Sequence, residues 1–188
     1  VQLNISYPPR TGNLDFDQWI SQLTDYLRGY LVSGEELLRN SGVIGNGVAD
    51  DTSAFQKVCD YIYTTHGTIT IPDNFIIRLT SQITVTGLHI IGRSRETSRF
   101  FIDYNGVGLY ASAAASFSIE NVTIAGVTGG MDWATHRPYA NSVGVSINSC
   151  HNHVVRNCLF HTLGTGLKVY GGGYCGITEG NLFQNNTI

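Results

Sequence analysis

The chain carries few side chains that could act as acid or base on a substrate. From residue 68 onward its acidic residues are Asp73, Glu96, Asp103, Glu120, Asp132 and Glu179. Hydrolysis of a glycosidic bond usually needs two carboxylates about 5 to 9.5 Å apart. In the repeat described below, Glu120, Arg156 and Glu179 take equivalent positions, with the arginine between the two acids. This order predicts a stacked ion ladder. No complete catalytic set is visible, and the catalytic residues are unknown.

A second group of reactive side chains lies between residues 125 and 141, a stretch that the repeat does not require. It contains Asp132, Trp133, His136, Arg137 and Tyr139. Aromatic faces can stack on sugar rings, and Asp and Arg can bond the hydroxyl or acidic groups of a sugar. Trp, Tyr and Arg also favour the centres of protein interfaces. We therefore expect this loop to bind a glycan, to contact another subunit or protein, or to pack on its own chain.

An apolar pattern repeats along residues 83 to 188. The set Ile83, Val85, Leu88 and Ile90 recurs as Phe117, Ile119, Val122 and Ile124, and again as His153, Val155, Cys158 and Phe160, with a weaker copy near 176–183. The triplets Val107–Leu109, Val143–Val145 and Thr165–Leu167 recur in step. Alternating apolar residues in units of about 22 residues predict a β-solenoid with one or two strands per coil. Extra loops are then expected near 93–105 and 125–141.

The segment ahead of the repeat predicts helices. Between residues 15 and 31 an apolar stripe follows helical spacing, formed by Phe16, Trp19, Leu23, Tyr26 and Tyr30. This stripe is expected either to serve as an anchor and oligomer face or to pack on the β body of its own chain. Ser33 and Glu36 form a capping box for a second, short helix that ends at Gly42.

Two adjacent carboxylates, Asp50 and Asp51, follow a glycine-rich turn that begins at Gly45. One of them can cap a helix that runs to about residue 63 and buries an apolar face. Carboxylates at a helix start are favoured by the helix dipole. Their expected role is therefore structural rather than catalytic.

The string from Gly45 to Gln56, followed by His66-Gly-Thr-Ile-Thr-Ile-Pro72, resembles the entry to the pectate-lyase-like parallel β-helix found in bacteriophage tailspikes and in some polysaccharide lyases and hydrolases. The resemblance covers residues 43 to 92 by motif and 93 to 188 by repeat. It implies an all-β, right-handed parallel β-helix. Residues 1–42 would form a helical adaptor or neck, and residues 43–188 a capping helix and the first coils. Because the chain stops within what reads as another coil, we expect it to be the front part of a longer polypeptide.

The same resemblance implies a function. Such a chain is expected to be a homotrimeric component of a phage tailspike or tail fibre, located in the virion tail and in contact with other tail proteins. It would recognise bacterial surface polysaccharide, which the full-length protein could also cleave. One alternative is a secreted polysaccharide lyase or glycoside hydrolase of the same group. Another is a structural fibre or adaptor without enzymatic activity.

The composition of the chain argues against several classes of binding partner. Charged residues make up 13% of the chain and the net charge is −3, which argues against binding nucleic acid through its phosphates. No stretch has the roughly 20 apolar residues needed to cross a membrane. The 4 cysteines are irregularly spaced, so we expect small buried thiols rather than a disulfide framework. The alternative to buried thiols is a metal site built from Cys150, His151, His153, His161 and Cys175, but no metal or cofactor is expected.

Overall fold

The computed structural model describes residues 34–65, 67–112, 116–126, 131–132, 137–138, 141–171 and 176–184. The chain divides into two compact units, Val1–Ser33 and Gly34–Ile188. All described residues belong to the second unit. The predicted anchor face, Phe16, Trp19, Leu23, Tyr26 and Tyr30, lies outside them. Its role, and the division of the chain at residue 42, therefore stay predictions.

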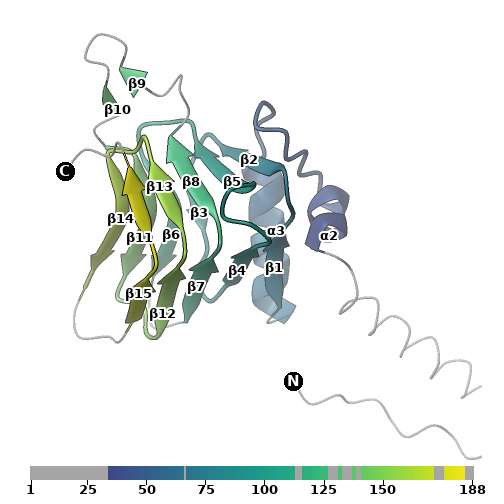
Figure 1. The fold of residues 1–188 in the computed structure, drawn as a ribbon. Coiled ribbons are helices and arrows are strands. Elements are labelled where there is room, and N and C mark those ends of the chain that lie inside the picture. The colour runs from purple at the N-terminus through teal and green to yellow at the C-terminus, as the bar shows by residue number, and fades with distance from the viewer. Residues whose placement is uncertain are drawn as a thin grey trace, which may run out of the picture. The chain divides into compact units, whose positions relative to one another are not determined.

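Three parallel sheets make up most of the second unit (Figure 1). The first sheet contains β1 (Thr68–Ile71), β4 (His89–Gly92), β7 (Phe117–Glu120), β12 (His153–Arg156) and β15 (Gly176–Glu179). The second contains β2 (Phe75–Leu79), β5 (Ser98–Ile102), β8 (Thr123–Gly126), β13 (Leu159–His161) and β16 (Leu182–Gln184). The third contains β3 (Ile83–Thr84), β6 (Val107–Ser112), β11 (Val143–Asn148) and β14 (Thr165–Tyr170). The chain visits the three sheets in the same order in each repeat, so the described part is mostly β with parallel pairing in these sheets.

The pairing register confirms most of the sequence repeat. Val143 pairs with Val107 on one side and with Thr165 on the other. Phe117 pairs with His153 in the first sheet. Phe183 pairs with Phe160 in the second sheet, which confirms the weak last copy.

Three features of the predicted repeat are wrong. Ile90 pairs with Ile119 rather than taking the place of Ile124, and Ile83 pairs with Leu109 in the third sheet. Each repeat also contributes up to three strands instead of one or two, and the stretch 93–105 is not an inserted loop because it contains β5. The error has a simple cause. Apolar alternation has the same period of two in all three sheets, so the pattern alone does not tell which sheet a short strand joins.

Columns of inward-facing side chains form the core. In the second sheet one such column runs through Phe100, Ile124, Phe160 and Phe183, each paired in register with the next. The first three side chains are fully buried. The rings of Phe160 and Phe183 stack with their centroids 4.9 Å apart and their planes 6° apart. This spacing matches the separation of neighbouring strands, so the column continues without a break to the last strand.

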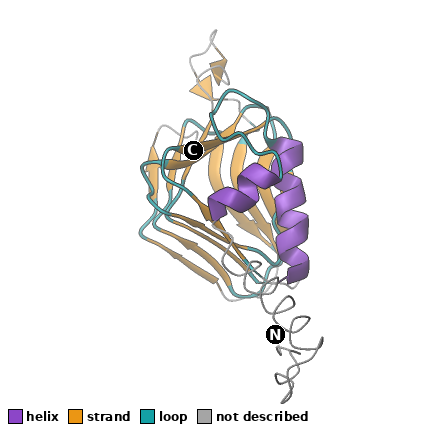
Figure 2. Cartoon of the chain, turned by 90° about the vertical axis from the view of Figure 1, so that its right-hand side faces the viewer, coloured by secondary structure: helices purple, strands orange, loops and turns teal. Residues whose placement is uncertain are grey.

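Two helices lie beside the first strands (Figure 2). The helix α3 (Thr52–Thr65) confirms the predicted helix and contacts β1, β2 and β3. Its buried Phe55 meets the Phe100 ring edge-on at 5.4 Å. The shorter α2 (Gly34–Asn40) contacts β1 and α3 and confirms the helix expected after Ser33. Among the described helices, none is long and apolar enough to cross a membrane.

Asparagines stack at the turn between the first and second sheets. Asn121 and Asn157 adopt positive φ values of 55° and 50°. The Asn157 side-chain nitrogen, Nδ2, donates to the Asn121 side-chain oxygen at 2.7 Å. In the next repeat the same position is occupied by Gly180, with φ 64°. The turn therefore demands a left-handed conformation, which Asn and Gly adopt most readily.

Replacing Phe160 by Ala is expected to lower the free energy of unfolding by about 3–5 kcal/mol, because a fully buried ring leaves a cavity in the column. Phe183 is the matched control, since it occupies the same column but is 51% exposed. Its replacement by Ala should cost about 1–2 kcal/mol. Urea unfolding followed by circular dichroism measures both values. Equal losses would mean that the column is not the centre of the core.

Candidate functional site

The structure places part of the predicted contact loop in a short hairpin. Its strands, β9 (Met131–Asp132) and β10 (Arg137–Pro138), pair antiparallel, and the backbone of Arg137 lies opposite that of Asp132. Asp132 and Arg137 are therefore direct cross-strand neighbours. Trp133, His136 and Tyr139 lie outside the described residues. The binding role of the loop stays a prediction.

The two carboxylates at the start of α3 have different partners. Asp50 Oδ1 accepts hydrogen bonds from the Thr52 amide at 3.0 Å and from the Thr52 hydroxyl at 2.5 Å. Asp51 is 1% exposed, and its two carboxylate oxygens accept from the amides of Ile44 at 2.8 Å and Gly45 at 3.2 Å. Asp50 thus serves the helix start, whereas Asp51 ties the glycine-rich turn to the helix. Both geometries are structural and neither carboxylate faces a cleft among the described residues.

Replacing Asp51 by Ala should destabilise the fold by about 2–4 kcal/mol, because two backbone amides near the buried carboxylate lose their acceptor. Replacing Asp50 by Ala should cost only about 1 kcal/mol, as expected for a more exposed capping residue. Urea midpoints of the two variants measure the difference. A larger loss in the Asp50 variant would contradict the assignment of the two roles.

The predicted ion ladder is present. Arg156 pairs in register with Glu120 on one side and with Glu179 on the other. Its guanidinium lies 3.5 Å from the Glu120 carboxylate and 2.5 Å from the Glu179 carboxylate. Both carboxylates are therefore engaged by the same guanidinium. The arrangement is therefore suited to holding neighbouring strands together.

A polar and aromatic surface covers the outward side of the third sheet. We call it the tyrosine face; its members are Tyr110 and Ser112 on β6, Asn148 on β11, and Lys168 and Tyr170 on β14, with Ser146 of β11 buried between them. Register brings Tyr110, Ser146 and Lys168 into one row, and Ser112, Asn148 and Tyr170 into the next. This surface was not predicted, although its residues directly follow the repeated triplets in each strand. The prediction used only the apolar residues of these strands, and the outward residues alternate with them.

Hydrogen bonds and a cation–π contact order the tyrosine face. The Asn148 side-chain nitrogen donates to the Tyr110 hydroxyl at 3.3 Å. This bond, together with weaker ones from Ser112 and Tyr170, lowers the pKa of Tyr110. The Lys168 ammonium lies 5.0 Å from the centroid of the Tyr170 ring, which is 41% exposed. Two tyrosines, an amide and one cation are therefore gathered on a rigid sheet, as a site on regular structure requires.

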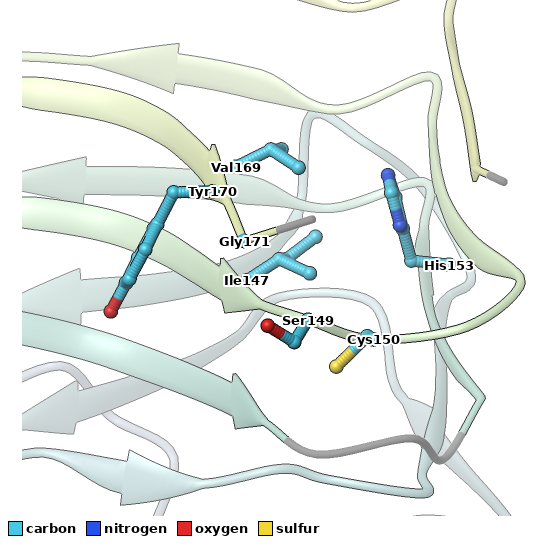
Figure 3. A pocket seen from close by; sticks show the side chains of 7 residues that line it. All are labelled: Ile147, Ser149, Cys150, His153, Val169, Tyr170 and Gly171. Atoms are coloured by element: carbon cyan, nitrogen blue, oxygen red, sulfur yellow. The ribbon is translucent and has the colours of Figure 1, made fainter. Parts of the chain in front are cut away.

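A small hollow opens where β11 and β14 end (Figure 3). It has room for about one water molecule, close to 20 Å³. His153 lines it with a ring nitrogen, Nδ1, that has no hydrogen-bond partner among the described residues. Gly176 makes space for this ring, since a Cβ there would lie 2.0 Å from it. The sulfur of Cys150 points away from the imidazole in Figure 3, and the hollow is too small for a sugar ring.

The cysteines behave as buried apolar residues. Cys59, Cys150 and Cys158 are free and buried. Burial raises the pKa of Cys158 to about 11, so this thiol is unreactive at neutral pH. Cys175 lies outside the described residues. Within the described ranges, no group of three or more His, Cys, Asp or Glu side chains is placed to hold a metal ion.

One histidine links stability to pH. Burial, and secondly the positive charge of Arg99, lower the pKa of His161 below its ordinary 6.5. The unfolded chain then binds a proton at higher pH than the folded chain does. Stability is therefore fully present above pH 6.5 and is lost as the pH falls through the lowered folded pKa.

Replacing His161 by Gln should flatten this loss of stability as the pH falls below 6.5. The matched control is His89→Gln, which changes an exposed histidine on β4. Thermal midpoints across this pH range measure the effect. Identical pH profiles for the wild type and the His161 variant would exclude His161 as the cause.

Comparison with known proteins gives a likeness in fold. No protein-family model matches the chain, and no curated protein matches it. Among solved structures, ORF18 of Geobacillus virus E2 is similar, with a TM-score of 0.53 and 17% identity over 81% of this chain. The chain spans 29% of the length of that virus protein. A presumed glycosyl hydrolase from Parabacteroides merdae also matches, with a TM-score of 0.27, 14% identity and coverage of 79% of this chain and 93% of its own. The first likeness shows a shared fold, and the second carries no argument at that score.

Proposed function

We propose that this chain is the front part of a phage tailspike or tail fibre that recognises bacterial surface polysaccharide. In this proposal the three parallel sheets are the faces of a right-handed parallel β-helix, and each repeat is one coil. The fold shared with a Geobacillus virus protein supports a phage origin. The strongest single support for polysaccharide recognition is the tyrosine face, with Tyr110, Asn148, Lys168 and Tyr170 on one sheet.

The chemistry of the tyrosine face suits a sugar. Tyrosine rings stack on the apolar faces of sugar rings, while their hydroxyls and an Asn amide bond sugar hydroxyls. Lys168 is the single charged member of the face, so an acidic sugar would also be accepted there. A strongly basic patch, as needed for nucleic acid, does not occur on this face.

Recognition is better supported than cleavage. The acids Glu120 and Glu179 are both bound to Arg156, and Asp103 is held 2.5 Å from Arg78. Each of these three carboxylates would have to leave its ion pair before it could act on a substrate. The described acids therefore favour a binding or structural role. This argument applies only to the part of the chain that the structure describes.

Attachment and assembly complete the proposal. The aromatic stripe Phe16, Trp19, Leu23, Tyr26 and Tyr30 would join the chain to the virion tail or gather copies into a trimer. The loop carrying Trp133, Arg137 and Tyr139 would contact a second subunit or the glycan. Replacing Trp19 by Ala, with light scattering as the readout, tests whether this stripe gathers copies of the chain.

Replacing Tyr170 by Ala should weaken binding to the recognised polysaccharide by about threefold to tenfold, the loss expected for one aromatic contact of about 0.5–1.5 kcal/mol. The assay is an array of immobilised bacterial capsule and O-antigen polysaccharides, followed by titration of any that bind. Tyr61→Ala is the matched control, because Tyr61 is 51% exposed on α3, away from the tyrosine face. The proposal fails if no polysaccharide binds, or if the Tyr61 variant loses as much affinity as the Tyr170 variant.

A further inference from the structure

The chain contains the Asn-Gly dipeptide twice, at Asn46–Gly47 and Asn105–Gly106. In such a pair the glycine amide can attack the asparagine side chain, because glycine has no side chain to hinder the approach. Folding decides whether the attack occurs, since the amide must be free and the backbone must be able to turn. We propose that Asn105 is a site of spontaneous deamidation and isoaspartate formation, and that the fold protects Asn46.

The reaction needs only water. The Gly106 amide nitrogen loses its proton and forms a bond to Cγ of Asn105, and the bond from Cγ to the side-chain nitrogen breaks. Ammonia leaves with the proton, and a five-membered succinimide ring remains. Water then opens the ring at either carbonyl. Opening at one gives aspartate, and opening at the other gives isoaspartate, whose main chain passes through the former side chain.

The geometry at Asn105 leaves the reacting groups available. Asn105 is exposed, and its side-chain oxygen accepts a hydrogen bond from the Asn141 amide at 3.1 Å. This is one amide donor, whereas the Asn46 side-chain oxygen accepts from two. The Gly106 amide forms no hydrogen bond with the part of the chain that the structure describes. Within the described part of the chain, no hydrogen bond holds the Gly106 nitrogen back.

At Asn46 the nucleophile is held. The Gly47 amide donates to the Ile76 carbonyl at 2.8 Å, and Asn46 forms an isolated parallel bridge with Ile76. The Asn46 side-chain oxygen accepts from the amides of Val48 and Ala49, both at 2.9 Å. A Cβ at Gly47 would lie 2.9 Å from the Ile76 side chain, so this turn is packed against β2. Succinimide formation there must first break these contacts.

Conversion of Asn105 would act on the predicted contact loop. The Asn105 side chain holds the Asn141 amide, and the Gly106 carbonyl accepts from the Val143 amide at 2.9 Å. These two bonds fix the point where the chain returns from the loop to β11. Isoaspartate adds a carbon to the main chain between residues 105 and 106 and so displaces Gly106. The modification would therefore loosen the base of the loop as the protein ages.

The test is to incubate the folded protein in mildly alkaline buffer and to measure deamidation of both peptides by mass spectrometry, separating aspartate from isoaspartate by chromatography. Asn105 should convert about fivefold faster than Asn46, because a net hydrogen-bond contribution of about 1 kcal/mol protects Gly47. The rate should rise with pH, since the deprotonated amide is the nucleophile.

Two controls make the result decisive. In urea both Asn-Gly pairs should convert at similar rates, which would assign the difference to the fold. In an Asn105→Gln variant the same peptide should stay unmodified, because a glutamine must close a larger ring. Equal rates in the folded protein, or faster conversion at Asn46, would overturn the proposal.

Discussion

The in-register stacking of parallel strands is the constraint on which the rest of this structure depends. Each strand must match both neighbours, and each inward side chain must fill the space beside the one before it. The column from Phe100 through Ile124 to Phe160 shows how closely the repeats obey this requirement. Additional residues can enter only between strands, and the hairpin of β9 and β10 does so. The strands beside α3 are covered by that helix, which places Phe55 against Phe100.

The sequence predicted those parts of the fold that have a local chemical signature. The start of α3 follows from a glycine turn and two carboxylates, and the pairing of Arg156 with Glu120 follows from one strong repeat. The register of Ile83 and Ile90 did not follow, because β3 has only 2 residues and the turn at Gly87 resets the alternation. The tyrosine face was missed because outward positions vary freely, so their alignment is visible only after the register is known.

Polar groups on this scaffold are largely satisfied by their neighbours in the next repeat. Asn157 bonds Asn121, Arg156 bonds two glutamates, and Arg95 donates to the Asn157 oxygen at 3.0 Å. Such pairing between strands far apart in sequence stabilises the stack and at the same time neutralises charge on the outside. It leaves aromatic and hydroxyl groups, rather than free charges, as the chemistry that the tyrosine face can offer to a ligand.

The tyrosine face and the turn at Asn105–Gly106 are held by different contacts. The third sheet holds Tyr110 on β6, which is paired on both sides, and holds Tyr170 on β14 through its pairing with β11. Asn141, just before β11, and Val143, the first residue of β11, donate hydrogen bonds to Asn105 and Gly106. A glycine there avoids a clash with Tyr104, since a Cβ at Gly106 would meet that ring at 2.3 Å. The packing that demands glycine at this turn is thus also what places a reactive dipeptide at the base of the loop.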